Sequence, residues 1–339
     1  MLTDTSYLKG NESVSLPPFV VEDVARALAQ LRAIKAQRGG MLCGIFLTEH
    51  VGDIVACEPV IRHARSQHPD AVLVWVTRST YAPLVAHHPL LDAVVTVASL
   101  ASVNPLIRSG IFYYSIDLNV HGKPTGIPGL LHEKIVGSRE IDTNSYVAWA
   151  PLLRAFSIGA GLPALDEAPT LYISAEADAK AACIARGEPF VVVHTVANDA
   201  RRSWPISNWR TLTEHILMRT RYLVYEVGLR STIRRQHARF RSLAGELSLL
   251  ETAAVIKNAT CFFGVESGPA HIANALQVNS LVLAGQFLDT DFFPYTGYFA
   301  ETRERSVLLH SSSVAELPIG TALAHPQTQR ILHDHAHDC

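Results

Sequence analysis

The chain has 339 residues, 48% of them hydrophobic and 18% charged, with 29 Lys and Arg against 31 Asp and Glu. This apolar content at a net charge of only -2 excludes a disordered chain and a basic surface for binding nucleic acid. No apolar run reaches the ~20 residues of a membrane span. The length therefore predicts two domains without a transmembrane helix.

The amino-terminal residues and the cysteines bear on the cellular compartment. Met1–Gly10 lacks the apolar segment of a signal peptide. The cysteines show no paired spacing, and four of them lie in apolar or helical patterns: Cys43, Cys57, Cys183 and Cys261. We expect reduced, buried thiols and a cytoplasmic location.

Residues 1–40 precede the first predicted core strand. Val24, Leu28 and Leu31 recur at helical spacing, and Gly39-Gly40 end the pattern. This predicts a helix packed on its own domain. An oligomer contact through this extension is the alternative.

Short β-branched runs then alternate with helical patterns, which is typical of a parallel sheet covered by helices. One helix is predicted at Asp53–Ser66, where Pro59 should kink it, and another at Ile206–Ile216. The predicted strands are Leu42–Leu47, Val72–Thr77, Ala93–Val97, Tyr113–Leu118, Phe190–His194, Tyr222–Val227, Cys261–Val265 and Leu281–Ala284.

The stretch Gly159–Pro169, rich in Gly and Pro, predicts the hinge between the domains. We therefore expect domains at 41–165 and 166–339 after the extension at 1–40. The carboxyl-terminal sequence HDHAHDC could catch a metal, but we expect a frayed chain end.

The first candidate site is the loop Thr48–Asp53, directly after a predicted strand. Ligands of open α/β sheets bind beyond the carboxyl ends of the strands. Gly52 suits a tight turn there, and Asp53 either caps the next helix or acts in a site. The loop has no G-x-G-x-x-G, so a dinucleotide fingerprint is not supported.

The second candidate is the run Val265–His271, after another predicted strand. Ser267 is suited to the N-cap of the following helix and Pro269 to its first turn. A helix that begins there offers free N–H groups and a positive dipole end to a phosphate, and His271 falls in the same turn. The alternative is a plain capped turn with a surface histidine.

The third candidate is His194–Pro205, again beyond a strand. It contains Arg201 and Arg202, and the planar fork of arginine matches phosphate oxygens. The alternative for each arginine is a solvated surface charge.

The sequence motifs resemble those of glycosyltransferase family 9, the bacterial ADP-heptose:lipopolysaccharide heptosyltransferases. Gly264–Leu276 is similar to the family's G-x-D-[ST]-G-x-x-H-x-A-x-A-L motif, and Gly52-Asp53 with Pro59 to its G-D-x-x-x-x-x-P loop. Ser203-Trp204-Pro205 with Asn208-Trp209 resembles its W-P-x-x-x-W segment.

The segment from Pro69 to Leu84 also resembles the family's next βα unit. Two departures keep charge but alter reach, since Glu266 stands where the family has Asp and Arg202 where it has Lys. The extension of about forty residues is not typical either.

The resemblance implies the GT-B fold, which is two Rossmann-like α/β domains with parallel sheets facing across a cleft. The acceptor would bind the first domain and a nucleotide-diphosphate sugar, similar to ADP-heptose, the second. Transfer would invert the anomeric centre and need no metal or other cofactor. A surface glycan, a lipid-linked glycan and a protein all remain open as acceptors, as does association with the inner membrane face.

The resemblance also implies roles for single residues. Asp53 would be the catalytic base, with Gly52 beside it on the acceptor side. Lys123, which keeps the family's spacing from Asp117, would contact an anionic acceptor, with a surface lysine as the alternative. The donor-binding residues would be Thr195, Arg202, Glu266, Ser267, Gly268 and His271.

Two rival functions remain open. A nucleotide-sugar epimerase or hydrolase would turn over the donor without an acceptor. A non-catalytic sugar-nucleotide-binding protein would bind the donor without turnover, but such bilobed proteins are usually exported and no signal peptide is expected here.

Overall fold

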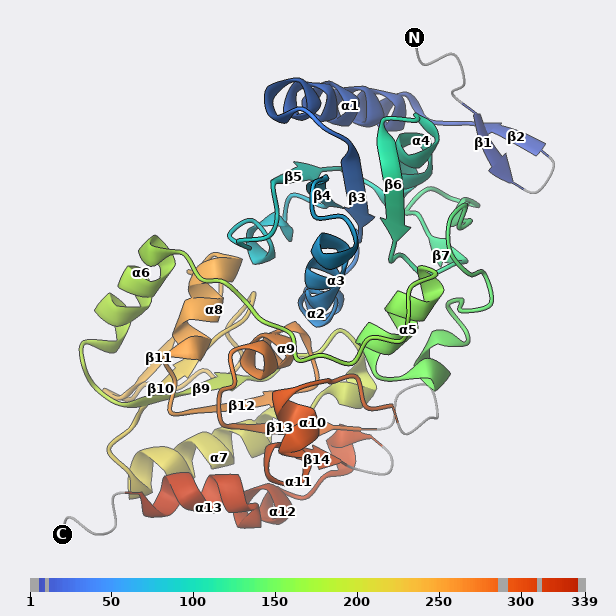
Figure 1. The fold of residues 1–339 in the computed structure, drawn as a ribbon. Helices are drawn as coiled ribbons and strands as arrows, with labels where there is room; N and C mark the ends of the chain where they lie inside the picture. The colour runs from blue at the N-terminus through green and yellow to red at the C-terminus, as the bar shows by residue number, and fades with distance from the viewer. Residues whose placement is uncertain (1–5, 10–11, 286–291, 310–312, 335–339) are drawn as a thin grey trace. The chain divides into compact units, whose positions relative to one another are not determined.

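The computed structural model describes the chain except for residues 1–5, 10–11, 286–291, 310–312 and 335–339, so the HDHAHDC sequence lies largely outside the described residues. The chain divides into two compact units, Met1–Tyr172 and Ile173–Cys339. Residues beyond the expected domain boundary at 165 still bond to the first unit. Glu58 accepts from the Thr170 N–H, and Arg62 donates to the Ala168 carbonyl. Figure 1 shows the elements of each unit.

The first unit contains a parallel sheet of four strands in the order β5-β4-β3-β6. In chain order the strands are β3 (Leu42–Phe46), β4 (Val72–Thr77), β5 (Ala93–Thr96) and β6 (Phe112–Asp117). Phe46 on β3 pairs with Val76 on one side and Asp117 on the other. The strand order reverses between β3 and β6, and this reversal is the switch point of the sheet.

Helices cover both faces of this sheet. α1 (Pro18–Arg38) and α4 (Val103–Arg108) pack on one face, where Val24, Leu28 and Leu31 are buried against the strands. α2 (Val51–Ala56) and α3 (Pro59–Gln67) lie on the other face (Figure 1). The single kinked helix predicted at Asp53–Ser66 is wrong. Proline is favourable in a first helical turn, so Pro59 starts α3 instead of bending one long helix.

The remaining elements of the first unit are small. α5 (Leu152–Gly159) precedes the boundary, and β7 (Lys123–Pro124) pairs with β8 (Leu131–His132). β1 (Ser6–Lys9) pairs with β2 (Glu12–Ser15).

The second unit contains a parallel sheet of six strands in the order β11-β10-β9-β12-β13-β14. The strands are β9 (Phe190–His194), β10 (Leu223–Glu226), β11 (Phe240–Ser242), β12 (Cys261–Val265), β13 (Ser280–Ala284) and β14 (Val307–Leu309). This is the order of the dinucleotide-binding fold, with its switch point between β9 and β12. The short edge strands β11 and β14 carry too few residues for a sequence pattern and were not predicted.

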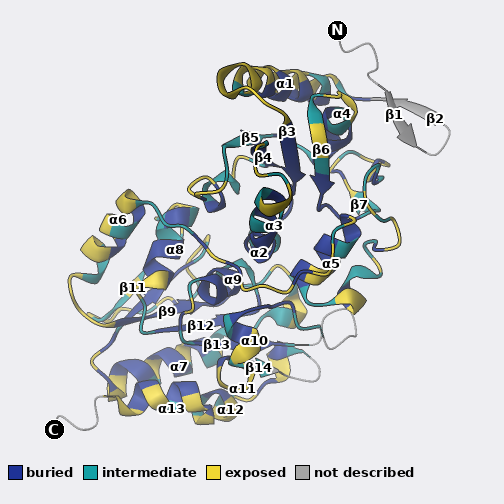
Figure 2. Ribbon diagram, viewed as in Figure 1, coloured by how far each residue is buried: buried dark blue, intermediate teal, exposed yellow. Residues whose placement is uncertain are grey.

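Two helical layers cover the second sheet. α7 (Ile206–Arg219), α12 (Ile319–Ala324) and α13 (Pro326–His333) share one core cluster with it. α6 (Ala175–Ala185), α8 (Leu249–Lys257) and α9 (Gly268–Ala275) lie on the other face (Figure 1). The short helices α10 (Tyr298–Glu301) and α11 (Arg303–Ser306) precede β14. Figure 2 shows the second sheet's central strands as buried, which explains their nearly continuous apolar runs.

The tryptophans of the W-P segment serve the core of the second unit. The Trp204 and Trp209 rings meet edge to face at 5.1 Å, and the Trp204 indole donates to the Leu317 carbonyl. This segment therefore anchors the start of α7 and fixes the end of the loop that carries the preceding arginines, beyond the carboxyl end of β9.

The expected α/β fold class is confirmed, because both units are Rossmann-like domains with parallel sheets. Cys43, Cys57 and Cys261 are buried, and burial raises the pKa of the Cys43 thiol to about 12. Cys183 is exposed, contrary to expectation, because it lies on the outer side of α6. No described helix combines the length and apolar character needed to cross a membrane.

Candidate active site

The candidate loops from the sequence lie at the two switch points. Thr48–Asp53 follows β3 in the first unit. In the second unit, His194–Pro205 follows β9 and Val265–His271 follows β12. His194 pairs with Gly264, so the second and third candidates are neighbours in space. Ligands of such sheets bind at the switch point, beyond the carboxyl ends of the strands.

Glu49 is the centre of a charged cluster in the first unit. Its buried carboxylate lies 3.3 Å from the Arg78 guanidinium, 3.4 Å from the Lys123 ammonium and 3.4 Å from Nδ1 of His50. Sequence reasoning missed Glu49 and Arg78. The register could have indicated Arg78, because it follows β4, the neighbour of β3, by one residue.

Asp53 is the third residue of α2, and His50 occupies the N-cap position. The interpretation of Asp53 as the cap is therefore wrong. Its carboxylate is 17% exposed and lies 3.7 Å from Nδ1 of His50. The contact with Asp53 raises the pKa of His50 above its ordinary value. Partial burial opposes this rise, and the negative charge of Glu49 adds to it. Gly52 is buried within α2, so the expected tight turn at this glycine is also wrong.

Lys123 starts β7 and is bound to Glu49, and its side chain remains 26% exposed. Asp117, the acid at the family spacing from it, is fully buried and lies 2.8 Å from Nε2 of His132. Lys123 and Asp117 therefore belong to different clusters, although their separation in the sequence is that of the family motif.

Glu266 joins an arginine and a histidine in the second unit. Its carboxylate pairs with the Arg202 guanidinium and lies 3.7 Å from Nε2 of His271. Burial would raise the pKa of Glu266, but the contact with His271 and the charge of Arg202 hold it below its ordinary value. Burial would lower the pKa of Arg202, and the charge of Glu266 raises it above its ordinary value instead. Arg202, Glu266 and His271, which the sequence motifs gave as donor-binding residues, thus form one cluster.

His271 is only 3% exposed, so its interpretation as a surface histidine is wrong. Its ring packs against Tyr295 with ring centroids 4.6 Å apart. Ser267 occupies the N-cap position of α9, but its hydroxyl donates to the Val265 carbonyl and does not cap the helix. Gly268 begins the helix.

Arg201 and Arg202 point to different partners. Arg201 pairs with Asp199 at 2.9 Å and is half exposed, whereas Arg202 pairs with the largely buried Glu266. Both arginines therefore have carboxylate partners, and only Arg202 belongs to the cluster at the switch point.

Thr195 lies at the same switch point, after β9. Its hydroxyl is 2.6 Å from that of Thr232, which also donates to the buried carboxylate of Glu226 at the end of β10. Sequence reasoning missed Glu226. Its place at the end of a predicted strand was the available signal.

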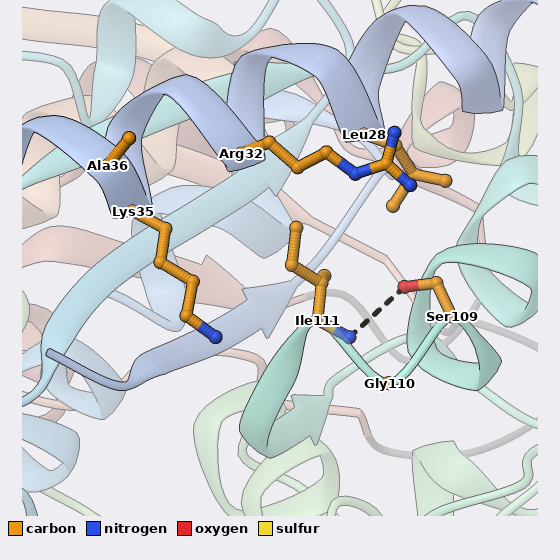
Figure 3. Close-up of a pocket in the computed structure, with 7 residues that line it drawn as sticks. All are labelled: Leu28, Arg32, Lys35, Ala36, Ser109, Gly110 and Ile111. Atoms are coloured by element: carbon orange, nitrogen blue, oxygen red, sulfur yellow. Dashed lines mark hydrogen bonds between the residues drawn. The ribbon is translucent and has the colours of Figure 1, made fainter. Parts of the chain in front are cut away.

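A cavity of about 430 Å³ lies elsewhere in the first unit, between α1 and the turn before β6. Figure 3 shows Arg32 and Lys35 reaching from α1 past Ile111. This cavity is at the amino end of β6, whereas both clusters follow the carboxyl ends of strands.

The model of glycosyltransferase family 9 (heptosyltransferase) matches residues 138–297. This stretch is just under half of the chain, and over it the chain is similar to that family. The matched stretch contains the whole Arg202–Glu266–His271 cluster, while Gly52 and Asp53 precede it. No protein with curated annotation matches this chain in sequence.

Solved structures extend the likeness of fold over most of the chain. A family 9 glycosyltransferase from Veillonella parvula is 12% identical with a TM-score of 0.63, over 87% of this chain and 97% of that one. The ADP-heptose lipopolysaccharide heptosyltransferase II of E. coli is 17% identical with a TM-score of 0.63, over 87% and 99%. E. coli heptosyltransferase WaaC with ADP-2-deoxy-2-fluoro heptose is 14% identical with a TM-score of 0.51, over 83% and 98%.

Proposed function

We propose that this glycosyltransferase moves a sugar, expected to be a heptose, from a nucleotide-diphosphate donor to an acceptor hydroxyl with inversion and without a metal. ADP-heptose is the proposed donor, and the lipopolysaccharide core or another bacterial surface glycan is the proposed acceptor. One E. coli enzyme of similar fold is named an ADP-heptose lipopolysaccharide heptosyltransferase, and another is a heptosyltransferase with ADP-2-deoxy-2-fluoro heptose, which supports this choice.

The observation that carries the proposal is the cluster of Arg202, Glu266 and His271 at the switch point of the second unit. Displacement at the anomeric carbon leaves negative charge on the departing diphosphate, and fixed cations in a water-poor site stabilise such charge strongly. In the proposed reaction Arg202, His271 and the N–H groups at the start of α9 meet the diphosphate.

Glu266 has a different task from the donor contact that its place in the motif implied. Its carboxylate already contacts both Arg202 and His271. The longer side chain of Glu, compared with the Asp of the family, suits it to reach both of these side chains. We assign it to holding Arg202 and His271 in place, while Thr195, Ser267 and Gly268 remain proposed donor contacts.

The reaction also needs a base for the acceptor hydroxyl, and Asp53 is the proposed one. Its carboxylate lies beyond a strand end, is partly exposed and, among the ion pairs of the described residues, contacts only His50. Lys123 and Gly52 remain proposed as acceptor-side residues, with Lys123 held near Asp53 through Glu49.

The test is a thermal-shift panel of nucleoside diphosphates and nucleotide sugars, followed by transfer assays with the best donor. A ligand at 100 times its Kd stabilises a protein by about 2.7 kcal/mol, which is enough to rank donors. Binding of ADP-heptose above other donors and product formation only with an acceptor are expected. Donor turnover without any acceptor would indicate a hydrolase or epimerase instead, and binding without turnover a carrier.

A further inference from the structure

One side chain, that of Asn119, links the two loops at the switch point of the first unit by hydrogen bonds. Asn119 follows β6, and its Oδ1 accepts from both the backbone N–H and the hydroxyl of Thr48, each at 3.0 Å. Thr48 follows β3 and starts the loop that leads into α2. Both residues are fully buried. The amide therefore ties together the two loops between which the strand order reverses.

The orientation of the Asn119 amide is determined by its partners. Its Nδ2 donates to Oδ1 of Asp117 at 2.9 Å and to the Phe46 carbonyl at 3.3 Å. A flipped amide would place oxygen against two acceptors and N–H against the Thr48 N–H. Asp117 is held in turn by His132 at 2.8 Å, so the amide has one stable position.

We propose that Asn119 is a positioning residue that holds Asp53 in its catalytic place through Thr48. This inference rests on the proposed role of Asp53 as the base. Only Glu49 and His50 separate Thr48 from α2, and the His50 carbonyl accepts the first helical hydrogen bond, from Ile54. A shift of Thr48 therefore moves the start of the helix that carries Asp53. Misplacing a catalytic group by about 1 Å can cost up to 10²-fold in rate.

The test compares Asn119→Asp with Asn104→Asp in the full-length protein. Aspartate has nearly the same shape but lacks the two N–H donors and adds a charge beside Asp117. Asn104 is a matched control, since it is 1% exposed in the same unit and its Nδ2 donates to the Glu133 carbonyl. Both variants are expected to lower Tm.

Three measurements separate positioning from a merely structural role. In Asn119→Asp, kcat with ADP-heptose and a heptose-free lipopolysaccharide acceptor should fall by about 10- to 100-fold, with the Kd for ADP unchanged. Amide hydrogen exchange in residues 47–53 should speed up. In Asn104→Asp, kcat and exchange in this loop should stay within about twofold of the parent protein.

Variants of Thr48 supply a second, milder pair. Thr48→Ser keeps the hydroxyl that bonds Asn119 and should retain kcat, whereas Thr48→Val loses it and should lower kcat. Unchanged exchange in residues 47–53 in Asn119→Asp, or equal losses of kcat in both Asn→Asp variants, would overturn the positioning role. If no acceptor supports transfer even by the parent protein, the proposed function fails, and the exchange comparison still decides whether Asn119 holds the loop.

Discussion

The two switch points of the molecule share one topology and differ in how they use charge. In the first unit, an arginine, a lysine and a histidine surround the buried Glu49, and a second carboxylate, Asp53, remains partly exposed. In the second unit, one carboxylate, Glu266, is clamped between Arg202 and His271. In the proposed function, the first arrangement leaves a carboxylate for proton transfer, and the second presents Arg202 and His271 to a diphosphate.

The physical reason for the difference is the cost of leaving a buried charge unpaired. Glu49 and Glu266 are both buried, and each is paired with basic side chains at a strand end. The units differ in the charged group that stays partly exposed beside the buried glutamate, which is the Asp53 carboxylate in the first unit and the Arg202 guanidinium in the second. The predictions below test that difference, from the largest expected effect to the smallest.

Asp53→Asn should abolish most transfer if the first unit supplies the base. The asparagine keeps the size of the side chain and its place in the first turn of α2, so the fold should survive. Removing a general base lowers kcat by about 10²–10⁴-fold. Steady-state kinetics with circular dichroism as the folding control would measure this. Near-normal turnover by a folded variant would leave the first unit without an assigned base.

Substitutions of Arg202 and Arg201 test the cation side of the comparison. Arg202→Ala should lower kcat/KM by about 10²–10³-fold, because a fixed charge at the leaving group is lost. Arg202→Lys should recover part of this loss, although an ammonium cannot bind two oxygens in parallel.

Arg201→Ala is the matched control for Arg202, since Arg201 pairs with Asp199 outside the cluster. An exposed pair contributes little, so its kcat/KM should stay close to that of the parent. Equal, small losses at both positions would show that neither arginine meets the diphosphate, and would leave the start of α9 as the proposed phosphate site.

Lys134 tests the electrostatics of the interior of the first unit. The lysine is buried and donates to the Gly159 carbonyl, and burial lowers its pKa from 10.5 to about 8 against the opposing charge of Asp117. Between these two pKa values the unfolded chain holds a proton that the folded chain has released. The free energy of unfolding should therefore rise with pH over this window, by on the order of 3 kcal/mol from this group.

Urea unfolding of Lys134→Met between pH 7 and 10 measures this effect, because the methionine variant lacks the titrating amine. Its free energy of unfolding should change less with pH than that of the parent across this range. Parallel curves for the two proteins would contradict the lowered pKa.

The smallest expected effect is that of a chelator. If Arg202 and His271 stabilise the leaving diphosphate, excess EDTA should leave the transfer rate unchanged. A rate that is lost in EDTA and restored by Mg²⁺ or Mn²⁺ would remove the electrostatic role assigned to the second unit.

The amino-acid sequence was sufficient for the core elements and for the region of the site. All eight predicted strands occur, within one residue at each end, because strands buried on both faces must be apolar runs of β-branched residues. The run 264–276 likewise carries its own strand end and helix start, so it could be placed beyond β12 without coordinates.

Contacts between distant segments were decided only by the tertiary structure. Asn119 meets Thr48 because β3 and β6 are neighbours in the sheet, and Glu49 meets Arg78 because β4 lies on the other side. Nothing in the spacing of these residues indicates either contact. The burial of His271 and the pairing of Glu266 with Arg202 likewise depend on how loops after β9 and β12 meet. Local patterns determine which segments become strands and helices, but partners of buried polar groups follow from the strand order, which is a property of the whole fold.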